Sequence, residues 1–149
     1  MNVEYMNEAF KCAKMAFDID EVPIGAVIVK NNQIISEAYN KKESMNCCIA
    51  HAEMLAIEEA SKKLNNWRLE DCDIYVTLDP CPMCASAIKQ ARIKNVYSAL
   101  SNSDSNNKNI INEIFKSDSV NPSVNFVSDL DSTKSQIILN KFFQKQRNS

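Results

Sequence analysis

The chain contains a single histidine, His51, followed two positions later by Glu53 in the segment HAEMLAI. Thirty positions after His51 comes DPCPMC, in which Cys81 and Cys84 lie three positions apart. A single histidine at the start of an apolar helix pattern is usually explained by core packing. The alternative is a metal ligand, and it requires a fold that brings residue 51 next to residues 81–84.

The segments around these residues alternate between helix and strand patterns. Residues 3–18 place apolar side chains at three- and four-residue spacings, which predicts an amphipathic helix. Residues 22–29 and 33–40 are rich in β-branched residues and flank Asn31-Asn32, a pair that tolerates the positive φ of a tight turn, so we expect an antiparallel hairpin. The predicted order continues with a helix over 50–64, a buried strand over 72–78, a helix over 82–92 and a strand over 95–100.

The two cysteines of DPCPMC follow the strand predicted over 72–78 and begin the next helix. A separation of three residues places Cys81 and Cys84 on the same face of the first helical turn. Pro82 suits that turn, because its missing N–H costs nothing there. The helix start also supplies free N–H groups and the positive end of the helix dipole, which lower the pKa of a thiol. We therefore expect two thiolates prepared to bind a cation.

The geometry of the chain allows His51 to reach these sulfurs. A helix of about fourteen residues rises ~21 Å and a strand of about seven covers ~23 Å. The chain thus leaves one edge of the sheet along the helix and returns to that edge along the strand. A right-handed crossover would place both helix starts side by side. His51 and the two thiolates then supply three ligands of a tetrahedral zinc site with an open fourth position, the arrangement of catalytic zinc.

Glu53 has two possible roles in such a site. As a fourth ligand it would close the site into a structural one. Two positions along a regular helix turn a side chain by about 200°, so His51 and Glu53 reach one point only at the helix tip. We therefore favour an open catalytic site, with His51 as a ligand and Glu53 free of the metal.

Length and terminal sequence limit the remaining possibilities. At 149 residues the chain suits one domain, residues 1–149. The N-terminus carries Glu4 and Glu8 where a signal peptide needs positive charge, and no run approaches the ~18 apolar residues of a membrane span. We expect a cytoplasmic protein without membrane association.

The other cysteines and the net charge also carry information. In a reducing compartment, cysteines outside the proposed site are expected to be buried thiols rather than disulfides. These are Cys12, Cys47, Cys48 and Cys72. The net charge of −2 argues against the broad basic surface of a sequence-blind nucleic-acid binder. Any RNA contact must come from a local patch.

The last third of the chain starts with a polar stretch. Residues 101–109, SNSDSNNKN, have no apolar period and predict an exposed loop. The segments that follow suggest a short helix over 111–115, an edge strand over 123–127 and a closing helix over 134–147.

The combination of HAE with PCxxC resembles the zinc-dependent nucleoside and nucleobase deaminases. More closely, the chain is similar to the bacterial tRNA-specific adenosine deaminases, which convert the wobble adenosine of a tRNA anticodon to inosine. The similarity rests on EVPIGAVIV, Asn40, AHAEMLAI, NWRLEDCDIYVTLDPCPMC and the paired phenylalanines of KFFQKQR. It implies an α/β fold, a cytidine-deaminase-like three-layer α/β/α sandwich with a mixed five-stranded sheet, formed by a single CMP/dCMP-type deaminase domain.

The resemblance also implies a hydrolase that acts on a C–N bond of a cyclic amidine, with one Zn2+ per subunit. Zinc would lower the pKa of a water molecule to about 7, so that hydroxide attacks C6 of adenine. Glu53 would take the water proton, deliver it to ring N1 and later protonate the departing amine. Asn40 would hydrogen-bond the target base, with a strand-ending turn as the alternative. Ala52, Pro23 and Ile24 would line the pocket, with ordinary packing as the alternative for Pro23 and Ile24.

The implied substrate is a tRNA anticodon stem-loop. Lysine and arginine position phosphates, while single-stranded bases stack on aromatic groups. Phe143 matches the second phenylalanine of the family motif and is the candidate stacking wall, with core or dimer packing of Phe142 and Phe143 as the alternative. The candidates for RNA-backbone contacts are Lys89, Arg92, Lys94, Lys141, Lys145 and Arg147. The resemblance further implies a homodimer in which the second and third helices form much of the interface.

Two departures from the family pattern keep another substrate open. After the fourth strand the family carries Gly-Ala-x-Asp and then a glycine-bearing loop that approaches the RNA, whereas this chain reads SALSNSDSNNKN, with Gly25 as its only glycine. Pro82 in PCPMC is common in guanine deaminases, which act on a free base. A guanine deaminase, or another free-nucleobase or nucleoside deaminase of the superfamily, is therefore the alternative. A non-catalytic zinc partner subunit would be expected to lack Glu53.

Overall fold

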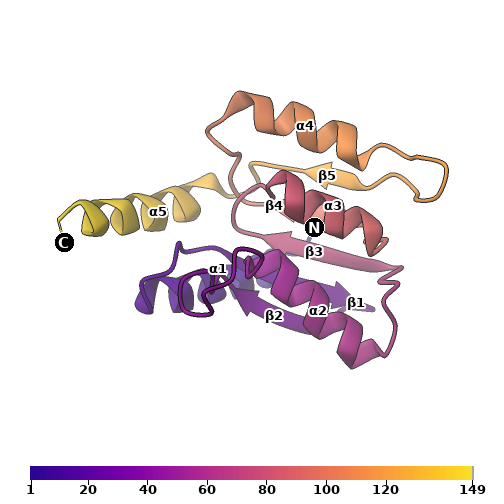
Figure 1. Ribbon diagram of the computed structural model, residues 1–149, viewed down its shortest axis with the longest axis horizontal. Coiled ribbons are helices and arrows are strands. Elements are labelled where there is room, and N and C mark those ends of the chain that lie inside the picture. Colours follow the sequence, from indigo (N-terminus) through magenta and orange to yellow (C-terminus); the bar gives the residue numbers. More distant parts are fainter. Residues whose placement is uncertain (149) are drawn as a thin grey trace.

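The computed structural model describes residues 1–148, so Ser149, the last residue of the domain predicted over 1–149, lies outside the described residues. These residues build a mixed five-stranded sheet in the order β2-β1-β3-β4-β5 (Figure 1). β1 is antiparallel to both of its neighbours, while β3, β4 and β5 are parallel. The strands are β1 (Gly25–Lys30), β2 (Gln33–Tyr39), β3 (Cys72–Val76), β4 (Asn95–Ser98) and β5 (Asn125–Val127).

Helices cover both faces of the sheet, which confirms the predicted three-layer sandwich (Figure 1). The helices are α1 (Val3–Asp18), α2 (Ala52–Leu64), α3 (Pro82–Gln90), α4 (Ser105–Phe115) and α5 (Ser132–Arg147). α2, α3 and α4 lie side by side over one face, and the larger apolar core lies beneath them. α1 covers β1 and β2 on the other face above a smaller core, and α5 contacts α1.

Gly25 is required by the close approach of α1 to β1. A Cβ atom at this position would lie 2.1 Å from the carbonyl oxygen of Ala9 and 2.6 Å from the backbone nitrogen of Ala13. Ala9 and Ala13 belong to the buried alanine-rich face of α1, which the apolar spacing predicted. The only glycine of the chain thus lets helix and strand backbones touch.

The predicted hairpin is confirmed, with a shift at its start. Asn31 and Asn32 have φ values of 51° and 59°, and Lys30 pairs with Gln33 across the two-residue turn. β1 begins at Gly25 rather than at residue 22, so Pro23 and Ile24 precede the strand. Proline has no N–H for a sheet ladder, which explains why pairing starts after it.

The loop predicted over residues 101–109 is wrong for its second half. α4 begins at Ser105, because the Asp104 side chain caps the helix by accepting from the N–H of Asn106. Asn107, Ile111 and Phe115 form its buried stripe. The stripe begins with a polar residue, so an apolar periodicity search starts the helix too late.

The prediction of buried thiols holds for only part of the set. Cys12 and Cys72 are buried, whereas Cys47 is half-buried and Cys48 is exposed. The latter two lie between β2 and α2, where no core-facing period fixes their direction. All six cysteines of the chain fall within the described residues and are free thiols. No helix within residues 1–148 combines the length and apolar character needed to cross a membrane.

Candidate active site

The N-termini of two helices meet at the end of the sheet where β3 ends, and they bring three ligand atoms together. His51 is the N-cap of α2 and Cys81 is the N-cap of α3. The Nδ1 atom of His51 lies 3.7 Å from Sγ of Cys81 and 3.5 Å from Sγ of Cys84. The ligand atoms of the three residues all lie within 4.8 Å of one another. The predicted convergence of residue 51 with residues 81–84 is therefore confirmed.

The spacing of these atoms fits a tetrahedral metal site. With Zn–N of about 2.0 Å and Zn–S of about 2.3 Å, nitrogen and sulfur ligands of tetrahedral zinc lie about 3.5 Å apart. The distances of 3.7 and 3.5 Å from Nδ1 of His51 to the two sulfurs lie close to this value. His51 has extended backbone angles and makes no side-chain capping hydrogen bond, so its ring is directed at the cysteines. These three residues could hold a metal ion.

The two sulfurs differ in their affinity for a proton. The pKa of Cys81 is lowered to about 5, first because the Cys84 thiol donates a hydrogen bond to it, and further because the N–H groups of Cys84 and Met83 and the charge of His51 favour the thiolate. The pKa of Cys84 is raised, because its thiol donates to Cys81 and because it is buried beside Glu53. The expectation that the helix start lowers both thiol pKa values is correct only for Cys81. A divalent cation would have to displace the proton that remains on Cys84.

Glu53 lies beside this cluster at the second position of α2. Its side chain is only 4% exposed, and burial raises its pKa to about 7, with the negative charge of Cys81 adding to the shift. The side chain of Cys84 lies next to this carboxylate. A carboxyl group with a pKa near neutrality can both accept and release a proton under ordinary conditions. The arrangement therefore combines three ligand atoms with one adjacent proton-transfer group.

The residues predicted to surround a substrate base have structural roles as well. Asn40 is 6% exposed, and its amide donates to the carbonyl of Val22 at 3.3 Å and accepts from the N–H of Lys42 at 3.2 Å. These bonds use one of the two N–H groups and one of the two lone pairs of the amide. The turn role considered for Asn40 is thus present. Pro23 is fully buried, Ala52 belongs to the larger core, and the partly buried Ile24 packs against that core.

The paired phenylalanines of α5 face different environments. Phe142 is buried, whereas the side chain of Phe143 is 48% exposed. Phe143 lines a cleft of about 250 Å³ between α5 and the ends of β3 and β4, together with Val22, Leu78 and Leu100. Core packing therefore accounts for Phe142 and leaves Phe143 as an aromatic wall.

The prediction of an RNA-backbone contact for Lys89 is corrected. Its side chain is buried, forms an ion pair with Asp118 at 3.2 Å and donates to the carbonyl of Lys116. An ammonium group held in this way is not available to a phosphate. It ties α3 to the loop before β5 instead.

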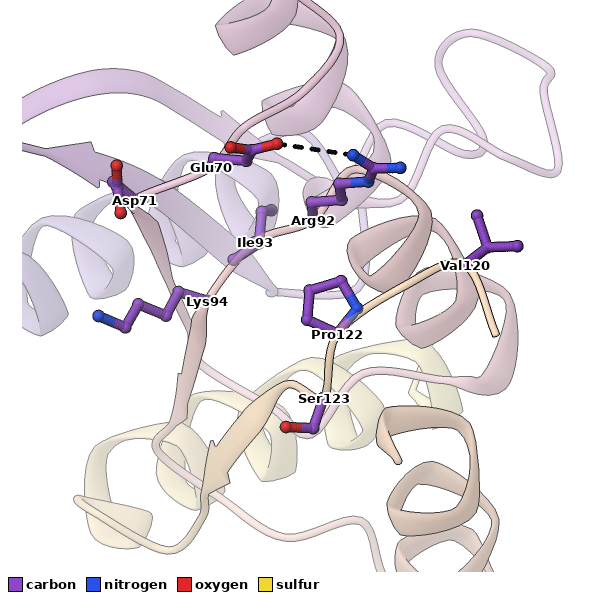
Figure 2. A pocket seen from close by; sticks show the side chains of 8 residues that line it. All are labelled: Glu70, Asp71, Arg92, Ile93, Lys94, Val120, Pro122 and Ser123. Atoms are coloured by element: carbon purple, nitrogen blue, oxygen red, sulfur yellow. Dashed lines mark ion pairs between the residues drawn. The ribbon is translucent and has the colours of Figure 1, made fainter. Parts of the chain in front are cut away.

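Arg92 and Lys94 lie far from the metal ligands. They follow the C-terminal end of α3, whereas Cys81 and Cys84 begin it, and a helix of nine residues spans about 13 Å. Figure 2 shows both around a pocket of about 480 Å³ that also contains Glu70 and Asp71. Arg92 forms an ion pair with Glu70 at 3.6 Å. This pocket has mixed charge, so the structure does not join it to the site as a basic patch.

The candidates on α5 remain at the surface. Lys141, Lys145 and Arg147 are exposed. Lys145 forms an ion pair with Asp20 at 2.8 Å, which partly neutralises its positive charge. These residues share their helix with Phe143, so they lie closer to the cleft than the group at the end of α3 does.

Three buried polar residues near the site were missed in the sequence. Glu21, Asp79 and Asn107 are 1%, 3% and 8% exposed. Asp79 directly precedes Pro80-Cys81, and this position was the only signal for it. Glu21 lies two positions before Pro23, whereas Asn107 has no sequence neighbour in the site.

Comparison with known proteins gives a consistent set of relatives. The family of MafB19-like deaminases matches residues 2–147. The tRNA-specific adenosine deaminase of Bacillus subtilis (strain 168) is 55% identical over 92 residues, which cover 62% of this chain but only 57% of that protein. The tRNA-specific adenosine deaminase of Aquifex aeolicus is 41% identical over 151 residues, which cover 100% of this chain and 99% of that protein.

Two solved structures extend the comparison. A structure from a study of A-to-I editing by tRNA:A34 deaminases at the wobble position of transfer RNA superposes with a TM-score of 0.84 at 33% identity, covering 93% of this chain and 100% of that one. A guanine deaminase from Bacillus subtilis superposes with a TM-score of 0.67 at 33% identity, covering 100% of this chain and 96% of that one. The first resembles this chain more closely in backbone shape.

Proposed function

Because this chain belongs to the MafB19-like deaminases and to the family of tRNA-specific adenosine deaminases, we propose that it hydrolyses the wobble adenosine of a tRNA anticodon to inosine. The observation that carries the proposal is the buried carboxyl of Glu53 beside the convergent ligand atoms of His51, Cys81 and Cys84. A proton-transfer group next to an open three-ligand site is what a hydrolytic deamination needs.

His51, Cys81 and Cys84 would hold one zinc ion per chain, and the fourth position would be left open. When bound, the metal would supply an activated water by lowering its pKa to about 7. Glu53 would accept a proton from this water and deliver it to N1 of adenine. As the C6–N bond breaks, Glu53 would pass a proton to the departing amine, which leaves as ammonia while oxygen remains on C6.

The remaining candidate residues are proposed to hold the substrate. The unused hydrogen-bonding capacity of Asn40 would recognise the base, and Pro23, Ile24 and Ala52 would form the apolar walls beside it. Phe143 would stack against a neighbouring base of the loop. Phosphates would be positioned by the exposed cations of α5, which are Lys141, Lys145 and Arg147.

We propose further that two copies of the chain associate and that the protein is cytoplasmic. Its six free cysteines fit a reducing compartment such as the cytoplasm, which also contains the proposed tRNA substrate.

A guanine deaminase is the second candidate. Pro82 favours it, and so does the structural likeness to the guanine deaminase from Bacillus subtilis. The higher TM-score with the tRNA:A34 deaminase structure favours the first candidate.

One assay separates the two candidates. The purified protein is given an anticodon stem-loop with adenosine at the wobble position, free guanine, adenosine or cytidine, and inosine or ammonia is measured at two salt concentrations. We expect turnover of the stem-loop alone, because base stacking contributes ~1–3 kcal/mol per base and this binding energy can lower the chemical barrier. Activity at subsaturating RNA should fall steeply from low to moderate salt, since phosphate contacts release counterions.

Guanine deamination would respond little to salt. Turnover of guanine combined with an inert stem-loop would refute the first candidate in favour of the second.

A further inference from the structure

The turn that presents Cys81 is held from outside by α4. This turn, residues 79–81, is the last part of the connection between β3 and α3. The carbonyl of Pro80, one peptide before Cys81, accepts a hydrogen bond from Nδ2 of Asn107 at 3.3 Å, and Asn107 is buried. The amide of Asn107 thus fixes the peptide that leads directly into a ligand residue.

Asp79 holds the other end of the same turn. Its N–H donates to the carbonyl of Leu100 at 2.8 Å. Its buried carboxylate accepts from the hydroxyl of Ser128 at 2.5 Å and from the N–H of Asn102 at 3.4 Å. The segment after β4 and the segment after β5 therefore both bind this one carboxylate.

The segment after β4 is itself fixed by side chains. The N–H and hydroxyl of Ser101 donate to the two carboxylate oxygens of Asp129 at 2.8 and 2.6 Å. The ammonium of Lys108 donates to the hydroxyl of Ser101 at 2.9 Å. Hydrogen bonds thus connect Lys108, Ser101 and Asp129, and the hydroxyl of Ser101 continues this network through the hydroxyl of Ser128 to Asp79.

We infer that residues 101–108 act as a bracket that positions Cys81 for metal binding, with Asn107 and Asp79 as its positioning residues. Cys84 lies inside α3, where helical hydrogen bonds fix it, but Cys81 is the N-cap and depends on the turn before it. Removing a hydrogen-bond partner that orients a metal ligand commonly weakens metal binding 10–100-fold. The polar residues of the bracket are needed for these bonds, which gives the glycine-free sequence 101–108 a structural role.

The inference rests on the metal site of the proposed function, and its test needs no RNA. Zinc affinity of the full-length protein is measured by competition with a chromophoric chelator, for Asn107→Leu and for Asn109→Leu. Leucine has the same number and branching of side-chain heavy atoms as asparagine but cannot donate to Pro80, so we expect Asn107→Leu to bind zinc 10–100-fold more weakly. Asn109 is exposed on the same helix, and its variant should match the unchanged protein.

A second variant, with a smaller change in side-chain shape, separates an effect on the bracket from misfolding. Asp79→Asn keeps the side-chain shape but replaces one acceptor oxygen by a donor, and it should also weaken zinc binding at least 10-fold while circular dichroism stays unchanged. Unchanged zinc affinity in both variants would overturn the bracket and leave the proposed function standing. Failure of the unchanged protein to bind zinc would instead overturn the metal site itself, and the bracket with it.

Discussion

Glu53 is the residue on which the proposed chemistry depends most directly. Its carboxyl lies at the start of α2, is buried and touches the thiol of Cys84. Burial disfavours its charged form, which is why its pKa rises to about 7. Burying a carboxyl group in this way costs folding stability, which favours a functional role for Glu53 over a structural one.

Replacement of Glu53 by glutamine or alanine should separate metal binding from catalysis. The variants should keep about one zinc per chain, because Glu53 is not among the three converging ligands. Turnover of the stem-loop should fall at least about 10²-fold, since proton transfer is lost. Metal content by atomic absorption and inosine formation give the two readouts. Glu59→Gln, exposed on the same helix, is the control, and normal turnover in the Glu53 variants would show that another group moves the proton.

Spacing made the ligand residues predictable from the sequence. Few residue types bind zinc. Two cysteines three positions apart at a helix start lie on the same face of the helix, so chain geometry predicts that His51 meets Cys81 and Cys84. Lys89 could not be placed correctly in this way. Its positive charge suggested a phosphate contact, but its partner Asp118 lies in an irregular loop whose path no periodicity predicts.

Regular elements were predictable for the same reason, while the elements held by polar contacts were not. The stripe of α1 and the Asn31-Asn32 turn carry local signals that the structure confirms. The helix predicted over 111–115 is shorter than α4, because the buried stripe of α4 starts with Asn107, whose hydrogen-bond partner is a carbonyl 27 positions away. The segment 41–50 likewise depends on a distant residue, Glu21.

Glu21 should anchor the segment 41–50, which ends next to His51. Its carboxylate accepts from the N–H groups of Glu43 and Ser44 at 2.9 and 2.7 Å, and the N–H of Lys41 closes the segment by donating to the carbonyl of Ala50 at 3.0 Å. Burial raises the pKa of Glu21, but these N–H groups outweigh it, and the pKa is lowered. Glu21→Gln should therefore lower the free energy of unfolding at pH 7 by about 1.5–3 kcal/mol, the usual contribution of hydrogen bonds to a charged group.

The loss of unfolding free energy in Glu21→Gln should decrease as the pH falls. A lowered folded pKa contributes stability above the unfolded value of about 4.3, and this contribution disappears as pH falls through the folded pKa. The difference between Glu21→Gln and the unchanged protein should therefore be full at pH 7 and shrink below about pH 4.3. Urea unfolding at several pH values measures it, with Glu43→Gln, an exposed side chain of the same segment, as the control. A difference that stays constant with pH would exclude the charge of Glu21 as its cause.

The arrangement of all layers was predictable only through family resemblance. Local patterns indicate the order of helices and strands, but the pairing of β1 with β3 involves residues more than forty positions apart. No short-range signal in the sequence specifies that register. The same holds for association between chains, which depends on surface shape.

The surface beside α2 carries the apolar side chains that a homodimer would cover. Met45 and Ile49 are 52% and 50% exposed in the segment 41–50. Met45 also lines a groove of about 390 Å³ with Tyr39 and Leu55 of α2. A stable interface buries about 800 Å² per partner, and apolar side chains at its centre contribute most of the affinity. We therefore expect two chains to meet on this side of the sheet.

Light scattering on a sizing column should give twice the chain mass of 16.8 kDa at micromolar concentration. Ile49→Lys should shift the protein toward the monomer, because association would bury an unpaired charge. Val120→Lys is the matched control, since Val120 is 69% exposed but precedes β5, at the sheet edge opposite β2 (Figure 1). If the anticodon site spans two subunits, Ile49→Lys should also lose stem-loop turnover while it retains zinc. A monomeric protein that still forms inosine would show that one chain supplies the complete site.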